Sequence, residues 1–153
     1  MRKDCPIQPW LSTRIFSKKE LHPPSSLVKM TSMGTTTTFK LVMPEHLNHF
    51  GFLFGGNLLR WVDETAWIAA TRDFPDCAFV TVAMDHVVFR KRSGNGDILR
   101  FESVQIARGH TSVRYEVTVF RRAPGSATDD PIFSTVVTLV RVNAEGKKVP
   151  LPS

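Results

Sequence analysis

The chain contains one long segment with the apolar periodicity of a helix, and the other long apolar segments have the pattern of β-strands. At about 100° per residue, residues 58–72 collect one apolar face made of Leu58, Leu59, Val62, Ala66, Ala69 and Ala70. Strand-like segments are residues 35–43 before this helix and residues 78–89, 98–107, 111–120 and 132–142 after it. The pattern predicts an α+β domain in which one helix lies along one face of an antiparallel sheet.

The segment at residues 111–120 shows the alternation most clearly. Val113, Tyr115, Val117 and Val119 share one face, as expected for a half-buried antiparallel strand. A single helix covers one face of a sheet only, so the other face and the edges need partners. We therefore expect a homodimer, with Trp61 and Trp67 on the flanks of the helix packing at the dimer contact.

Composition excludes several classes of protein. Of the net charge of +6, +4 lies in residues 1–30, which leaves a nearly balanced body and argues against a nucleic-acid-binding domain. No apolar run reaches the roughly 20 residues of a membrane-spanning helix. Cys5 and Cys77 have neither a CxxC partner nor metal-ligand spacing, which favours a reducing, cytoplasmic location.

The first 34 residues differ in composition from the rest. They are basic, contain Pro6, Pro9, Pro23 and Pro24, and lack apolar periodicity, so we expect a flexible extension. Two alternatives are organelle targeting through residues 1–30 and a later translation start at Met30 or Met33. The folded domain is expected over residues 35–146, followed by a C-terminal tail at residues 147–153.

The entrance to the helix is the first candidate for chemistry. Gly55 and Gly56 directly precede the helical segment, and free backbone N–H groups at the positive end of a helix dipole can stabilise an oxyanion. The alternative is a glycine-lined turn with Asn57 as the N-cap. Both interpretations are compatible with the residues.

Two adjacent carboxylates on the helix have different surroundings. Glu64 falls on the solvent face, where it can pair with Arg60. Asp63 falls at the margin of the apolar stripe, a partly desolvated position that suits a catalytic carboxylate. The alternative for Asp63 is a structural role, in which it caps a neighbouring backbone group or pairs with a basic residue.

Other candidates are weaker. His46 and His49 lack a third ligand, so no metal site is expected. Asp85 and His86 could form a catalytic dyad, although a surface or interface pair is the more common arrangement. There is no GxSxG motif.

Two segments could bind phosphate or pantetheine groups. Arg90, Lys91 and Arg92 form a basic cluster at a strand end, which suits phosphate recognition; a solvated turn is the alternative. A tight turn with hydroxyls and backbone donors is formed by Gly109, His110, Thr111 and Ser112.

The ordered set of motifs resembles the hot-dog-fold acyl-CoA thioester hydrolases, which include the bacterial and cytosolic acyl-CoA thioesterases. The resemblance covers about residues 41–142 and rests on Met43-Pro44, Asn48, Gly51, Phe54-Gly55-Gly56, Leu59, Asp63, Val80-Thr81-Val82-Ala83, Phe89, Lys91, Gly96-Asp97, Gly109 and Thr111-Ser112. Leu47, Arg92 and His110 depart from the residues usual in the family.

The resemblance implies a sheet of five to six strands wrapped around one long central helix. It also implies a homodimer with active sites across the interface, assembling further to a hexamer as a trimer of dimers. Asp63 would act as general base or nucleophile at the thioester carbonyl, and Asn48 from the other subunit would position water or substrate. Backbone N–H groups of Gly55 and Gly56 would stabilise the oxyanion.

The implied reaction is hydrolysis of acyl-CoA to free CoA and a carboxylic acid, without metal or other cofactor. The CoA portion would lie along the basic cluster at residues 90–92 and the turn at residues 109–112. Two alternatives remain: a non-catalytic acyl-CoA-binding or sensing module, and a hot-dog hydratase or dehydratase.

Overall fold

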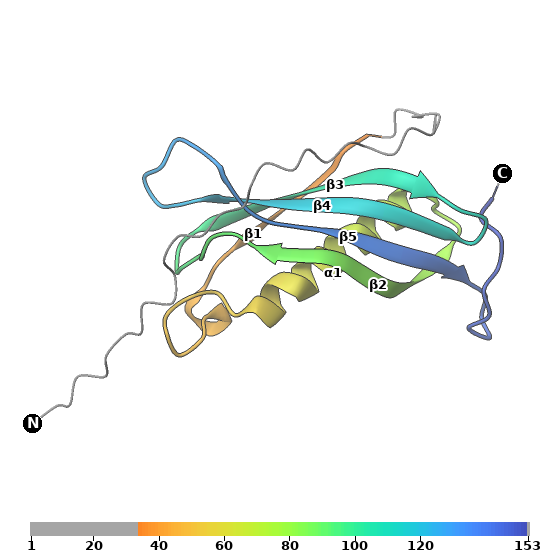
Figure 1. Ribbon diagram of the computed structural model, residues 1–153, viewed down its shortest axis with the longest axis horizontal. Helices are drawn as coiled ribbons and strands as arrows, with labels where there is room; N and C mark the ends of the chain where they lie inside the picture. The colour runs from red at the N-terminus through yellow and green to blue at the C-terminus, as the bar shows by residue number, and fades with distance from the viewer. Residues whose placement is uncertain (1–33, 153) are drawn as a thin grey trace, which may run out of the picture.

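The long helix connects the two edge strands of a five-stranded antiparallel sheet (Figure 1). The computed structural model describes residues 34–152. Its elements are β1 (Thr36–Leu41), a short 3-10 helix η1 (Pro44–His46), α1 (Gly55–Asp73), β2 (Ala78–Phe89), β3 (Ile98–Arg108), β4 (Ser112–Arg122) and β5 (Asp130–Val142). The strand order is β1-β3-β4-β5-β2, and all neighbouring pairs are antiparallel. The predicted sheet with one long helix is confirmed for the described residues.

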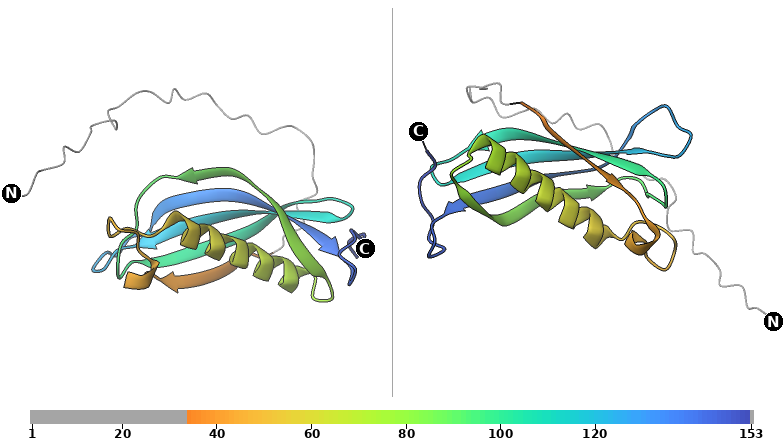
Figure 2. Two further views of the ribbon diagram at one scale, coloured as in Figure 1. Left: turned by 90° about the horizontal axis from the view of Figure 1, so that it is seen from below. Right: turned by 180° about the vertical axis from the view of Figure 1, so that it is seen from behind.

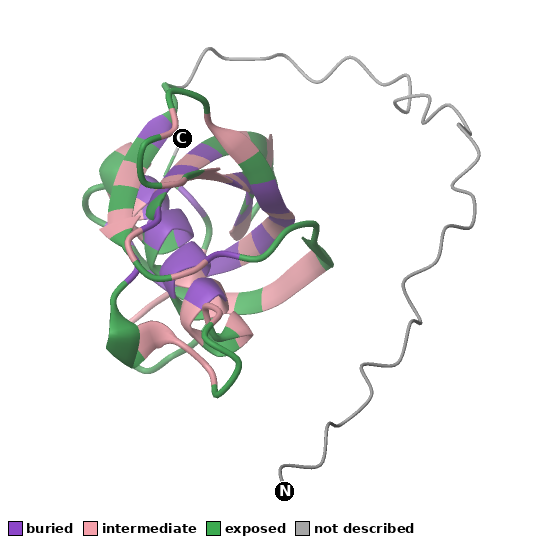
Figure 3. Ribbon diagram, turned by 90° about the vertical axis from the view of Figure 1, so that its left-hand side faces the viewer, coloured by how far each residue is buried: buried purple, intermediate pink, exposed green. Residues whose placement is uncertain are grey.

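α1 lies along one face of this sheet (Figure 2), and the sheet curves around the buried side of the helix (Figure 3). The side chains buried on the helix are Leu58, Trp61, Val62, Thr65, Ala66, Ala69 and Ala70. The three alanines are small side chains, which allows the helix to lie close to the sheet. The core-facing side chains of β4 are fully buried: Val113, Tyr115, Val117 and Val119. The predicted alternation in this strand is therefore confirmed.

α1 begins at Gly55, three residues earlier than the apolar periodicity predicts. Phe54 is the N-cap, and its carbonyl accepts hydrogen bonds from the N–H groups of Asn57 (3.0 Å) and Leu58 (3.3 Å). The prediction of Asn57 as N-cap is wrong, because its side chain donates to the His46 carbonyl at 3.1 Å instead. Because glycine has a low helix propensity, the sequence places Gly55 and Gly56 before the helix. In the structure, tertiary contacts place them in the first helical turn.

The buried stripe of α1 also differs from the prediction. Trp61 is 6% exposed, with its ring edge-on to Phe101 and His46, so its assignment to the helix flank was wrong. Leu59, predicted in the stripe, is only partly buried. Thr65 takes a core position because its hydroxyl donates to the Trp61 carbonyl at 2.8 Å. Trp67 does lie on the exposed side, at 45% exposure.

The strand bounds agree with the sequence pattern to within two residues at each end. β2 covers the predicted residues 78–89, and β3 extends one residue beyond its prediction. β5 begins at Asp130, two residues early, because Arg121 and Asp130 pair across β4 and β5. The loop predicted at residues 124–131 is correspondingly shorter.

β2 is a long edge strand with an irregular centre. Its register with β5 shifts between Asp85 and Val88, and His86 has a φ of 55°. The Thr135 hydroxyl donates to the Asp85 carbonyl at 2.7 Å and holds this bulge. The exposed apolar side chains on the strand are Val80, Val82, Val87, Val88 and Phe89. An apolar edge of this length needs a covering partner.

The C-terminal segment packs against the turn between β3 and β4. The N–H of Leu151 donates to the His110 carbonyl at 2.8 Å, and the Leu151 side chain is buried. At the other end of the chain, the predicted extension lies outside the described residues up to residue 33. No helix among residues 34–152 combines the length and hydropathy required to span a membrane.

A part-buried hydrogen bond ties the C-terminal turn of α1 to β4 of the sheet. The Tyr115 hydroxyl donates to Asp73 Oδ2 at 2.6 Å. Burial raises the pKa of the Tyr115 phenol, and the hydrogen bond to Asp73 and its charge raise this pKa further. Ionisation of Tyr115 is therefore strongly disfavoured in the folded chain.

This hydrogen bond predicts a specific alkaline transition. Because the folded-state pKa of Tyr115 is raised above its unfolded value of about 10, stability is intact below about pH 10 and falls as the pH rises above it. Tyr115 is the only tyrosine in the chain, so tyrosinate absorbance reports this group alone. We expect that absorbance to rise together with the loss of far-UV circular dichroism.

The matched variant is Tyr115→Phe. It should lose about 1.5 kcal/mol of unfolding free energy near neutral pH. This value is the low end for a hydrogen bond to a charged group, because the half-buried Asp73 carboxylate can be hydrated in the variant. Its alkaline loss of stability should be smaller than that of the wild type in urea titrations. Tyrosinate formation well before unfolding in the wild type would contradict the prediction.

Candidate active site

Asp63 lies on the side of α1 that faces edge strand β2. The Thr81 hydroxyl donates to Asp63 Oδ1 at 2.6 Å, and the carboxylate is half-buried. Within residues 34–152, no group donates a hydrogen bond to Oδ2. One oxygen is therefore held in place while the other is available to accept a proton.

Glu64 has the different surroundings that helical geometry predicts. It is exposed and pairs with Lys40 of β1 at 3.3 Å. The predicted pairing with Arg60 is replaced by this contact across two elements, because β1 runs beside the outer flank of α1. Glu64 is thus an ordinary surface carboxylate.

A pocket of about 240 Å³ opens at the N-terminus of α1. Residues from the 48–58 segment, the end of β2, the loop after it and β5 line the pocket: Asn48, Phe52, Leu53, Gly55, Leu58, Phe89, Lys91, Arg92, Ser93 and Ile132. Its walls are largely apolar, with an amide, a helix N-terminus and two cations at the margin. This combination suits an anionic ligand with an apolar portion.

Asn48 organises the loop that leads into α1. Its side-chain Oδ1 accepts hydrogen bonds from the N–H groups of Phe50 (2.9 Å) and Phe52 (3.2 Å). These two bonds fix the orientation of the amide, and its Nδ2 has no acceptor among the described residues. Asn48 can therefore serve a ligand in the pocket as a hydrogen-bond donor.

Gly55 brings the positive end of α1 to the pocket. The first N–H groups of a helix have no intrahelical partner, and the first turn of α1 contains no acidic residue. Gly56 lies beside the pocket without lining it. A Cβ on Gly56 would fall 2.6 Å from the Phe54 ring, so an alanine there would displace that ring. The N–H of Gly55 is the better placed oxyanion donor.

The basic cluster divides into three separate environments. Arg90 donates to the Ser134 hydroxyl at 2.9 Å and does not line the pocket. Lys91 lies 3.2 Å from Asp130, and the Arg92 guanidinium stacks over the Phe52 ring at 4.7 Å. Only Lys91 and Arg92 therefore present charge to the pocket.

The turn at residues 109–112 lies at the opposite end of the sheet. β3 separates this turn from the basic cluster and is 11 residues long, so the two segments are about 33 Å apart. Backbone groups of the turn are used internally: the Gly109 N–H donates to the Ser112 carbonyl, and the His110 and Thr111 carbonyls accept from Leu151 and Arg141. One protomer does not bring both predicted CoA-binding segments together.

Asp63 is also separated from the pocket within one protomer. Gly55 and Asp63 are about 12 Å apart along the helix axis, and Asp63 does not line the pocket. Reacting groups must approach to about 3–3.5 Å. An oxyanion donor at Gly55 and a base at Asp63 therefore act on the same carbonyl only if they come from two protomers.

The other candidate residues from the sequence are two histidines before α1 and the Asp85-His86 pair of β2. His46 Nδ1 accepts from the Met43 N–H, and His49 stacks on Phe50. The Asp85 carboxylate pairs with Arg114 at 3.5 Å, and exposed His86 occupies the bulge of β2. In the described part of the chain, no group of three or more potential metal ligands occurs.

Sequence reasoning gave no structural role to Ser93, Arg121 and Asp130 near the pocket, and it named Thr81 and Asp97 only as parts of motifs shared with the family. Asp97 accepts hydrogen bonds from the Ser93 hydroxyl and the Gly94 N–H, at 2.9 and 2.8 Å. The sequence signal for Asp97 was the Gly96-Asp97 dipeptide, which is typical of a turn. The cross-strand contacts of Arg121 and Asp130 have no signature in the local pattern.

Comparison with known proteins gives consistent results. The thioesterase superfamily model matches residues 50–128. An acyl-CoA thioester hydrolase of Bacillus subtilis is 32% identical over 113 residues, which are 72% of this chain and 64% of that protein. The chain thus spans under two thirds of this relative, and 16% of a mouse acetyl-coenzyme A thioesterase.

Solved structures agree in fold and sequence. A hexameric hot-dog-fold thioesterase of Campylobacter jejuni superimposes with a TM-score of 0.69 at 34% identity, over 75% of this chain and 88% of that one. A Staphylococcus aureus acyl-CoA hydrolase with bound butyryl-CoA and CoA gives 0.71 at 28% identity, over 78% and 72% of the two chains. The chain therefore belongs to the thioesterase superfamily and has its hot-dog fold.

Proposed function

We propose that this protein hydrolyses acyl-CoA thioesters to free CoA and a carboxylic acid. The observation that carries the proposal is the position of Asp63, anchored by Thr81 beside the free edge of β2 with one carboxylate oxygen available. A thioester needs a base for water and donors for the oxyanion, and residues suited to both roles lie on α1.

In the proposed reaction, water attacks the thioester carbonyl carbon while Asp63 accepts one of its protons. The C=O electron pair moves onto the oxygen, which the Gly55 N–H at the helix N-terminus stabilises. Collapse of the tetrahedral intermediate breaks the C–S bond, and the proton held by Asp63 passes to the CoA thiolate. Asn48 acts as a donor from its free Nδ2, since its Oδ1 is occupied within its own loop.

The proposed active unit is a homodimer formed through the β2 edges. Antiparallel pairing around a two-fold axis near the middle of β2 reverses the partner, so Asp63 of one subunit approaches the helix N-terminus of the other. The same reversal brings the turn at residues 109–112 to the end of the sheet where the partner subunit's Lys91 lies. Pairing also covers the exposed apolar side chains of β2.

Solved structures of related proteins support this proposal. The solved structures of the S. aureus hydrolase include one variant with an asparagine replaced by alanine and another with an aspartate replaced. Those two positions have the same separation as Asn48 and Asp63 here. The hexameric relatives favour further assembly into a trimer of dimers.

The proposal includes no metal or organic cofactor and a cytoplasmic location. The mechanism uses side chains and backbone groups of this chain alone, with CoA as part of the substrate. A reducing compartment suits the free, buried thiol of Cys77. The alternative of organelle targeting concerns residues 1–30, which lie outside the described residues.

Two other activities have less support. A hydratase or dehydratase needs a positioned Asp/His pair, and Asp85 instead pairs with Arg114. A sensing module would bind acyl-CoA without requiring a carboxylate such as Asp63 beside the site. The carboxylate variants below separate the sensor from the enzyme.

Asp63→Asn should lower kcat for acyl-CoA hydrolysis by about 10²–10⁴-fold, because it removes the general base. Glu64→Gln, a matched change on the adjacent residue, should leave kcat within about twofold. Release of CoA, followed with a thiol reagent across a panel of acyl-chain lengths, measures both variants. A wild type that binds CoA esters without turnover would identify a sensor instead.

Mixing two inactive variants tests the shared active site. Asp63→Asn and Asn48→Ala homodimers should each be impaired, and subunit exchange between them should restore up to about a quarter of wild-type activity, since half of the dimers are mixed and each has one intact site. Activity after mild denaturation and refolding of the mixture measures this. The absence of recovery, despite dimers demonstrated by light scattering, would place both residues in one subunit's site.

A further inference from the structure

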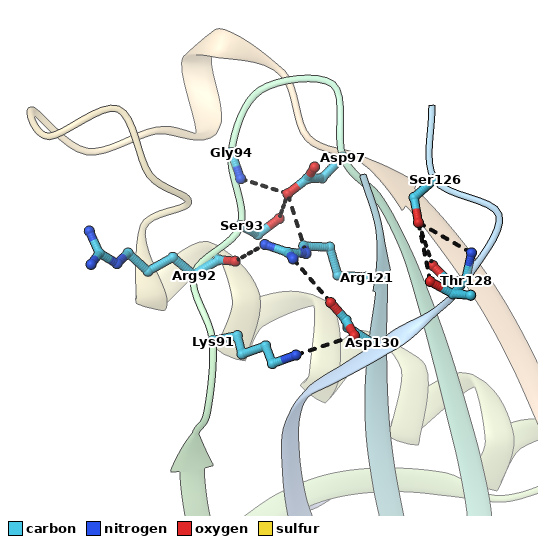
Figure 4. A network of polar contacts seen from close by, with 9 residues as sticks. All are labelled: Lys91, Arg92, Ser93, Gly94, Asp97, Arg121, Ser126, Thr128 and Asp130. Atoms are coloured by element: carbon cyan, nitrogen blue, oxygen red, sulfur yellow. Dashed lines mark hydrogen bonds and ion pairs between the residues drawn. The ribbon is translucent and has the colours of Figure 1, made fainter. Parts of the chain in front are cut away.

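Asp130, the first residue of β5, contacts two cations, Lys91, which lines the pocket, and Arg121 of β4 (Figure 4). Its Oδ1 lies 3.2 Å from Lys91 Nζ, and its Oδ2 accepts a hydrogen bond from Arg121 at 3.2 Å. The hydrogen bond from Lys91 and its charge, together with Arg121, lower the pKa of the Asp130 carboxyl. Asp130 is therefore ionised near neutral pH.

Arg121 connects this carboxylate to the loop that follows β2. It donates to the Arg92 carbonyl at 2.7 Å, and its Nε lies 4.0 Å from Asp97 Oδ2. Asp97 in turn holds the Ser93 hydroxyl and the Gly94 N–H. The loop backbone at residues 92–94 is thus fixed from β4 independently of Lys91 (Figure 4).

The two cations on Asp130 differ in freedom. The Lys91 side chain is 52% exposed, and Asp130 is its one carboxylate partner among residues 34–152. Arg121 is 25% exposed and held at three points. If Lys91 turns toward a ligand, Asp130 keeps Arg121 as its counter-charge. Exchange of Lys91 between Asp130 and an external anion therefore leaves no unpaired charge behind.

We propose that Asp130 is a positioning residue that competes with the phosphate groups of acyl-CoA for Lys91 and so sets the affinity for the phosphorylated end of the substrate. This inference rests on the proposed function, because Lys91 lines the pocket assigned there to the substrate. Before substrate binds, Asp130 pairs with Lys91. This pairing weakens binding of the nucleotide end of the substrate.

The test compares Asp130→Asn with Asp129→Asn. Asp129 is an adjacent carboxylate that pairs with Arg100 and Arg122 rather than with the loop, so its variant controls for the loss of one negative charge. Calorimetric titration with CoA, dephospho-CoA and pantetheine measures binding without turnover. Asp130→Asn should bind CoA about two- to fivefold more tightly, the range expected for releasing one exposed pair, with a steeper dependence on salt.

Pantetheine, which has no phosphate, should bind the wild type and Asp130→Asn equally, and dephospho-CoA shows which phosphate Lys91 meets. In a Lys91→Gln background, Asp130→Asn should no longer tighten CoA binding, which a merely structural role of Asp130 would not explain. Unchanged CoA affinity in Asp130→Asn, or equal tightening in Asp129→Asn, would overturn the inference and leave the proposed function intact. A wild type that does not bind CoA would overturn both.

Discussion

The packing of α1 against the concave face of the sheet is the contact on which the rest of this structure depends. The helix connects β1 to β2, the two edges of the sheet, so it must run across the strands that form the centre. Its buried alanines allow the helix backbone to approach the sheet closely, and larger side chains there would lift the helix from the core. Every candidate site residue takes its position from this helix or from the strand ends around it.

One consequence is that the candidate catalytic groups lie at two separate places along the helix. The N-terminus of α1 lies at the pocket with the Gly55 N–H and the Asn48 amide, whereas Asp63 lies two turns further along beside β2. Since β2 is a free, apolar edge, the surface that needs a partner is also the surface beside the carboxylate. In the proposed homodimer, this arrangement would couple dimer formation to completion of the active site, because neither subunit alone brings both a base and an oxyanion donor to one carbonyl.

The charged side chains around the pocket differ in burial. Buried charges are paired, whereas exposed ones can exchange partners. Asp97 is buried and Arg121 is 25% exposed, and both contact the loop at residues 92–94. Lys91 and Arg92 extend from that loop with more freedom, one against Asp130 and the other over Phe52. For the proposed substrate, exposed cations on a hydrogen-bonded loop suit phosphate recognition, because an exposed side chain can change its partner without breaking the contacts that hold the loop.

The sequence by itself determined the fold class, the number of strands, most strand bounds and the different environments of Asp63 and Glu64, because apolar periodicity directly reflects which side of an element is buried. It did not determine where α1 begins, since helix propensity disfavours the glycines that tertiary contacts place in the first turn. The sequence also did not show that the Arg90 side chain points away from the pocket to Ser134, or that Lys91 pairs with Asp130. It did not show that residues 109–112 lie at the end of the sheet opposite the basic cluster. Those relations were decided by the tertiary structure, because strand order and register bring together residues that no local pattern connects.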